Sequence, residues 1–156
     1  MDTMPWDYYV DPATPKPATR ELVAALERVI ARSPEHPGAL HFYIHAIEPS
    51  TTPDRAEPAA DTLGSLAPGA GHLVHMPSLV YLRVGRYADA SAANVRAAAA
   101  DESYITQCRA QGFYPAAYYP HNIHFLYASS AFEGRSRVSI DAARKLSANI
   151  TPDIVE

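Results

Sequence analysis

The chain has 156 residues, of which 47% are hydrophobic, and carries a formal net charge of −4 from 13 basic and 17 acidic side chains. This length and composition suit a single globular domain with its own core. The negative charge, with no cluster of lysine and arginine, argues against nucleic acid or an anionic membrane as the main partner, and no run of about 18 apolar residues is present to span a bilayer.

The spacing of apolar residues between proline and glycine breaks predicts helices along most of the chain. Pro77 lies inside one of these helices, at 71–84, and predicts a kink there. No segment shows convincing strand alternation, so the predicted fold class is all-α. In chain order the expected helices cover about 19–33, 39–48, 53–67, 71–84, 87–100, 122–132 and 135–147, with a short helical candidate at 104–111.

These elements divide the chain into three parts. Residues 1–18 form a proline-rich N-terminal segment, 19–147 the helical domain, and 148–156 a C-terminal tail, with an insertion at 101–120 that interrupts the helical rhythm. The first residues lack the basic-then-apolar layout of a signal peptide. The single cysteine, Cys108, has no partner for an internal disulfide and fits a reducing compartment. We therefore expect a cytoplasmic protein.

A repeat with a period of 34 residues runs through the helical part. His41 and His75 are 34 residues apart, and so are Pro34 and Pro68. This is the period of a tetratricopeptide repeat, a pair of helices that stacks on its neighbours. The three helix pairs should therefore stack in register, with the third displaced by the insertion.

One stretch carries the spaced residues of such a repeat. It has a tyrosine, a turn glycine, a second aromatic residue and two small residues where the helices cross: Tyr81, Gly85, Tyr87, Ala90 and Ala97. The chain thus resembles the tetratricopeptide repeat (TPR) family over roughly residues 20–147. The resemblance implies an antiparallel helix-pair solenoid of about 2.5 to 3 repeats plus the insertion.

Three sequence segments make the family resemblance more specific. HPGALHFYIHAIE, GAGHLVHMPS and YPHNIHF look like a group of bacterial tetratricopeptide proteins. In that group a histidine often follows the MPS element, where this chain has Leu79. The helix at 19–33 matches the second helix of a repeat whose first helix is absent, so we expect the chain to be part of a longer solenoid. Its uncapped apolar stripe, from Leu22 to Ile30, predicts self-association.

Six of the seven histidines form three pairs at helical spacing. Residues three or four apart share one face of a helix, so each pair can present two imidazoles to one point. The family resemblance implies that the first helix of each repeat lines a concave groove, and hence that all six imidazoles face it. The pairs are His41 and His45, His72 and His75, and His121 and His124.

Two interpretations of these histidines stay open. In the first, neutral imidazoles hold a transition metal, and Zn, Cu, Fe and Ni are all compatible with such ligands. An open coordination position would then serve a hydrolase or an oxidase. In the second, the histidines contact a peptide or protein segment in the groove, or are partly buried and bonded to the backbone. No catalytic residue can be identified from the sequence. The further residues expected to line the groove are Glu48, Leu79, Tyr118, Tyr119 and Asn122.

Overall fold

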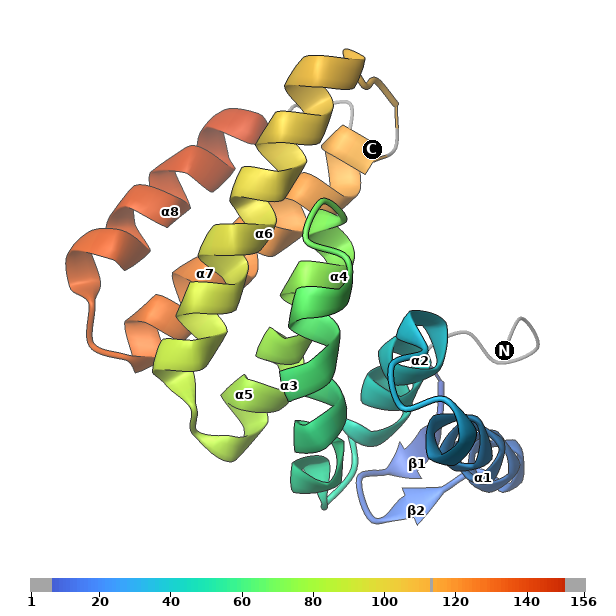
Figure 1. The fold of residues 1–156 in the computed structure, drawn as a ribbon. Coiled ribbons are helices and arrows are strands. Elements are labelled where there is room, and N and C mark those ends of the chain that lie inside the picture. The colour runs from blue at the N-terminus through green and yellow to red at the C-terminus, as the bar shows by residue number, and fades with distance from the viewer. Residues whose placement is uncertain (1–6, 113, 151–156) are drawn as a thin grey trace.

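The computed structural model describes residues 7–112 and 114–150, and the chain is all-α as predicted (Figure 1). The one departure is a small antiparallel sheet formed by β1 (Tyr9–Asp11) and β2 (Thr14–Pro15). The prediction of no strands was wrong here, because strands of two and three residues are too short to show an alternating pattern. Residues 1–6 and 151–156, parts of the predicted N-terminal segment and tail, lie outside the described residues.

The β hairpin is attached to the first two helices, α1 (Pro17–Arg32) and α2 (Pro37–Ile47). The hydroxyl of Thr19, a fully buried residue of α1, donates to the carbonyl of Tyr8. The hydroxyl of Tyr9 donates to the carbonyl of Ala46 in α2 at 2.9 Å. The proline-rich segment therefore folds back onto the helices through side-chain bonds to backbone carbonyls.

Part of the apolar stripe of α1 is buried within the chain. Leu26 and Ile30 pack against the main core, whereas Val29 is 38% exposed. The stripe is therefore only partly available to another molecule.

The middle of the chain follows the predicted order. It contains a 3-10 turn, η1 (Pro53–Ala56), then α3 (Glu57–Leu66), α4 (Gly71–His75) and α5 (Pro77–Val84). The helix predicted at 71–84 is divided at Met76, because Pro77 has no backbone N–H to donate to the preceding turn.

The sixth helix is longer than predicted. α6 covers Tyr87–Cys108, so the break predicted after residue 100 is absent, and so is a separate helix at 104–111. No proline or glycine occurs between 87 and 111 to end the helix. It stops instead at Arg109, which has a left-handed backbone with φ 48°.

The C-terminal part consists of a π-helical turn, η2 (Tyr114–Tyr118), followed by α7 (Tyr119–Phe132) and α8 (Ser136–Asn149). α7 begins three residues earlier than predicted, because Pro120 is accommodated in its first turn. Much of the predicted insertion at 101–120 is therefore helical.

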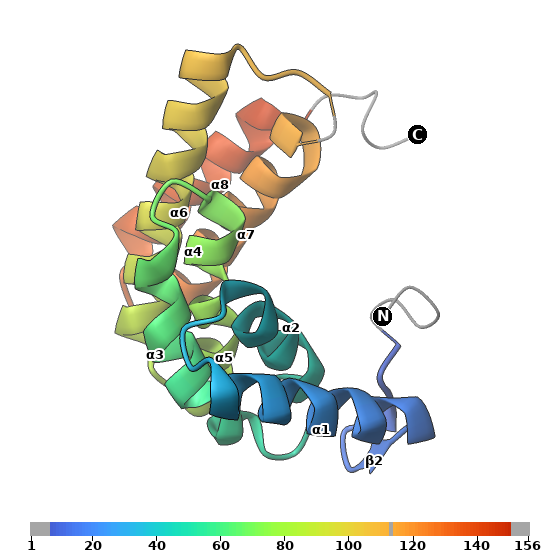
Figure 2. The same cartoon turned by 45° about the vertical axis from the view of Figure 1, so that its right-hand side comes forward.

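The helices pack mainly on neighbours in the chain and form a curved stack, with α1 and α2 near one end and α6, α7 and α8 side by side at the other (Figures 1 and 2). Two apolar clusters hold the stack together. The larger joins α2, α3 and α5, and the smaller joins α6, α7 and α8. None of the described helices is both long and apolar enough to cross a bilayer. The largest fully buried apolar side chains are Leu40, Ile44, Ile47, Leu63, Met76, Val80 and Ile123.

A close approach between α4 and α6 requires glycine at position 71. A Cβ atom there would lie 1.9 Å from Oδ1 of Asp101 and 2.9 Å from the carbonyl oxygen of Ala97. We expect Gly71→Ala to lower the free energy of unfolding by about 2 kcal/mol, because one of these groups must move. Urea unfolding measures the change. Gly69→Ala is the control, since a Cβ there meets nothing within 4 Å; equal losses in the two variants would contradict the prediction.

Candidate metal centre

The first histidine pair lies on the face of α2 that is turned away from the core. The helix begins at Pro37, and Nδ1 of His36 accepts the backbone N–H of Ala39 at 3.1 Å. Leu40, Ile44 and Ile47 bury the opposite face. His41 and His45, one turn apart, are thereby both left partly exposed on the other side.

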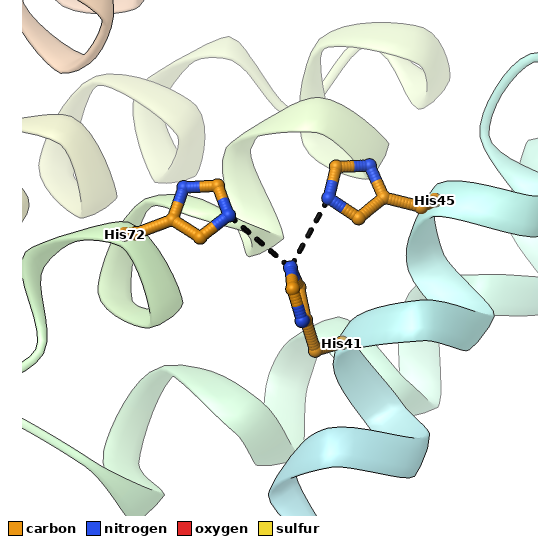
Figure 3. A group of neighbouring side chains, drawn as sticks. All are labelled: His41, His45 and His72. Carbon is orange, nitrogen blue, oxygen red and sulfur yellow. Dashed lines mark hydrogen bonds between the residues drawn. The ribbon is translucent and has the colours of Figure 1, made fainter. Parts of the chain in front are cut away.

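Three imidazoles converge between α2 and α4. Nε2 of His41 lies 3.1 Å from Nε2 of His45 and 3.2 Å from Nε2 of His72, so His41 is in contact with both (Figure 3). The three ligand atoms all lie within 4.8 Å of one another. Within residues 7–112 and 114–150, this is the one group of three or more His, Cys, Asp or Glu side chains that converges in this way. We call His41, His45 and His72 the histidine triad.

A second pair of imidazoles lies beside the triad. Nε2 of His75 is 3.1 Å from Nε2 of His121, which brings α7 into contact with α4. The ring centroids of His72 and His75 are 6.1 Å apart. Five of the six predicted histidines therefore form one continuous group, drawn from three helices.

His124 is separate from that group. Its ring stacks on Tyr127 with centroids 6.1 Å apart and also contacts the edge of Phe125. His124 is exposed and lies beside Ala143 and Leu146 of α8 at a surface pocket, so it is directed toward α8 and the solvent. The structure does not bring His124 to the other five.

The environment keeps the grouped imidazoles neutral. Burial, and to a smaller extent the neighbouring imidazoles, lowers the pKa of His45 to about 3 and that of His72 to about 4. Burial also lowers the pKa values of His41 and His121. The fully buried His75 has its pKa lowered well below the ordinary value. Neutral imidazole is the form that ligates a metal, so these side chains are in the state that binding needs at pH 7.

The other predicted groove residues have different surroundings. Glu48 follows α2, outside the triad, and burial raises its pKa while Arg83 opposes the shift. Leu79 packs against the larger apolar cluster. The ring of Tyr118 contacts that of His72, with centroids 4.8 Å apart. Tyr118 thus lies beside the triad.

Tyr119 and Asn122 bond to residues of α6 and hold α6 and α7 together. The hydroxyl of Tyr119 donates to Glu102 at 3.0 Å, and Nδ2 of the fully buried Asn122 donates to Asp101 at 2.7 Å. Asp101 also accepts the hydroxyl of Tyr114 at 2.6 Å. This buried carboxylate joins α6 to η2 and to α7, and so fixes the position of the neighbouring His121.

Two polar residues that support the centre were missed in the sequence. Asn94 contacts His75, and Asp101 anchors the insertion. Both are 0% exposed and lie seven residues apart on the face of α6 that also buries Ala90 and Ala97. A polar residue repeated on an alanine-lined face was the signal available, because buried polar groups require partners.

Comparisons with models of protein families, with curated proteins and with solved structures gave no significant match. The function is therefore inferred from the geometry of the histidines.

Proposed function

We propose that this chain is a helical-repeat protein of the tetratricopeptide type that binds a transition-metal ion through Nε2 of His41, His45 and His72. The main support is the double contact at His41. Its Nε2 has two imidazole nitrogens at 3.1 and 3.2 Å. One ring nitrogen carries either a proton or a lone pair, so it can make only one well-directed hydrogen bond with these two neighbours. A cation between the three nitrogens would be ligated by all of them.

The distances fit a small metal ion. Metal–nitrogen bonds of 2.0 to 2.1 Å in a tetrahedral site separate the ligand atoms by about 3.3 Å. The two contacts of His41 are already near this value, and side-chain rotation within the 4.8 Å limit would bring His45 and His72 together. Imidazole suits Zn, Cu, Fe and Ni. We propose the cytoplasm as the compartment, in keeping with the exposed free Cys108.

The test is metal analysis of the purified, untagged chain, followed by titration with Zn²⁺. We expect at least one equivalent to bind, and His41→Ala to weaken binding at least 100-fold because it removes the central ligand. His124→Ala is the matched control and should bind like the wild type. Circular dichroism checks that the variants stay helical. Less than a tenth of an equivalent, with no binding on titration, would contradict the proposal and leave the peptide groove as the interpretation of the histidines.

A metal-dependent hydrolase is the second candidate function. The triad supplies three ligands and all three side chains are partly exposed, so a fourth position would be open to water. A metal ion lowers the pKa of bound water and makes it a nucleophile near pH 7. Hydrolysis of an activated ester by the Zn²⁺-loaded wild type, and its loss in His41→Ala, would support this candidate. Equal rates in the two proteins would exclude it.

A further inference from the structure

The starting point is the imidazole pair that is not part of the triad. Nε2 of His75, on α4, and Nε2 of His121, on α7, are 3.1 Å apart. His75 is fully buried, whereas His121 is exposed. The pair therefore has one rigidly packed member and one member that solvent and ions can reach.

Hydrogen bonds determine which nitrogen of His75 carries the proton. Nδ2 of Asn94 donates to the carbonyl oxygen of Ala90 at 3.0 Å, which orients the amide. Oδ1 of Asn94 then faces Nδ1 of His75 at 2.7 Å. Because this oxygen can only accept, Nδ1 of His75 must be the donor.

The lone pair of the neutral ring is consequently on Nε2, which faces His121. Ser78 reinforces the arrangement, since its hydroxyl donates to the same Oδ1 at 3.3 Å. A ring nitrogen bonded to an amide or carboxylate oxygen, with the other nitrogen directed at an ion, is how proteins commonly orient a metal-ligating histidine. Asn94 is the residue that supports His75 in this way.

We propose that His75 and His121 hold a second metal ion next to the triad, so that the centre is dinuclear, with Asn94 as a positioning residue for His75. This inference rests on the proposed function, because it assumes that the triad holds the first ion. The 3.1 Å separation fits one edge of a tetrahedral site. Two protein ligands leave two positions for water or for oxygen atoms of a substrate, so the second ion binds more weakly than the first. Paired metal ions of this kind act together on hydrolytic and phosphoryl-transfer substrates.

The test is a titration of the full chain with Co²⁺. Calorimetry and the visible absorption of the bound ion measure how many equivalents bind and how tightly. We expect two equivalents in the wild type, the second weaker than the first. His121→Ala should lose the second equivalent and keep the first within about threefold of its affinity. His41→Ala should lose the tighter one. His124→Ala should keep both.

Asn94 is tested separately from the ligands. Asn94→Ala should weaken the second equivalent by about 10- to 100-fold, whereas Asn94→Asp keeps an acceptor for Nδ1 and should retain it. If Asn94→Ala fails to fold, Asn94→Asp alone provides the test. Loss of the second equivalent in a folded Asn94→Asp protein would contradict the role of Asn94.

Three results would contradict the proposal of a second metal ion. A single equivalent unaffected by His121→Ala would leave the triad alone as the site. A single equivalent lost equally in His41→Ala and His121→Ala would mean one shared ion. No Co²⁺ binding to the wild type would overturn both the second ion and the proposed function.

Discussion

The metal-free protein should lose stability steeply between pH 6.5 and pH 5. In the folded chain the pKa of His45 is lowered to about 3 and that of His72 to about 4, while both take the ordinary value of about 6.5 in the unfolded chain. Throughout this pH range the unfolded state therefore binds protons that the folded state does not. Stability is full above pH 6.5 and falls as the pH is lowered.

His45 and His72 determine how steeply the free energy of unfolding falls with pH. One proton taken up on unfolding corresponds to about 1.4 kcal/mol per pH unit, so two give a slope of up to about 2.7 kcal/mol per pH unit. The lowered pKa values of His41, His75 and His121 act in the same direction. A typical domain has a total stability of about 5 to 15 kcal/mol, so this loss is large.

Urea unfolding of the chelator-treated protein at pH 7, 6 and 5 measures the slope. The control is the double variant His45→Gln with His72→Gln, which replaces both imidazoles by polar groups that do not titrate and should show a distinctly shallower slope. Zn²⁺ should stabilise the wild type by about 2.7 kcal/mol at a hundredfold excess over its dissociation constant. It should do so at pH 7 and much less at pH 5, where protons compete for the ligands. Equal slopes in wild type and double variant would contradict the assignment.

Asp101→Ala should destabilise the fold more than any other single substitution considered. The side chain is 0% exposed and accepts two hydrogen bonds, from Tyr114 at 2.6 Å and from Asn122 at 2.7 Å. Alanine leaves both donors without this acceptor, and we expect a loss of roughly 3 kcal/mol in the free energy of unfolding. Chemical denaturation measures it.

The adjacent residue is a suitable control. Glu102 lies on the exposed side of α6, where it pairs with Lys145 and accepts the hydroxyl of Tyr119, so Glu102→Ala should cost about 1.5 kcal/mol or less, about half the cost at Asp101. Equal costs at 101 and 102 would contradict the role given to Asp101. Gly71 offers a second check, because its missing Cβ leaves the space that Asp101 occupies. Gly71→Ala should therefore cost less in an Asp101→Ala background than in the wild type.

The helices of this protein were largely predictable because proline and glycine mark most of their ends. α2, α5 and α8 begin and end within two residues of the expected positions once the division at Met76 is allowed for. The error in α6 has a clear cause. The alanine-rich run ends at residue 100, but no proline or glycine follows before Gly112, and Asp101, in the continued helix, is buried against Tyr114 and Asn122. Those partners come from later in the chain.

The candidate site was predictable in its residue types and in part of its geometry. Helical spacing placed His41 and His45 on one face, and the structure has them 3.1 Å apart. The spacing of three residues that brings both His72 and His75 into the group does not do so for His124, because α7 packs with His121 toward α4 and with His124 toward α8. Tyr118 was expected to line the groove, but its contact with His72 and the bond between Asn94 and His75 were not predicted.

The sequence by itself determined the all-α class, the limits of most helices and the presence of paired imidazoles, because these depend on interactions between residues close together in the chain. The tertiary structure alone decided that His41 meets His72 across two helices, that His75 meets His121 across 46 residues, and that His124 meets neither. Those contacts depend on how far each helix is rotated and shifted against the next. That packing is set by side chains distant in sequence, such as Gly71 against Asp101, whose mutual fit appears only when the helices are in place.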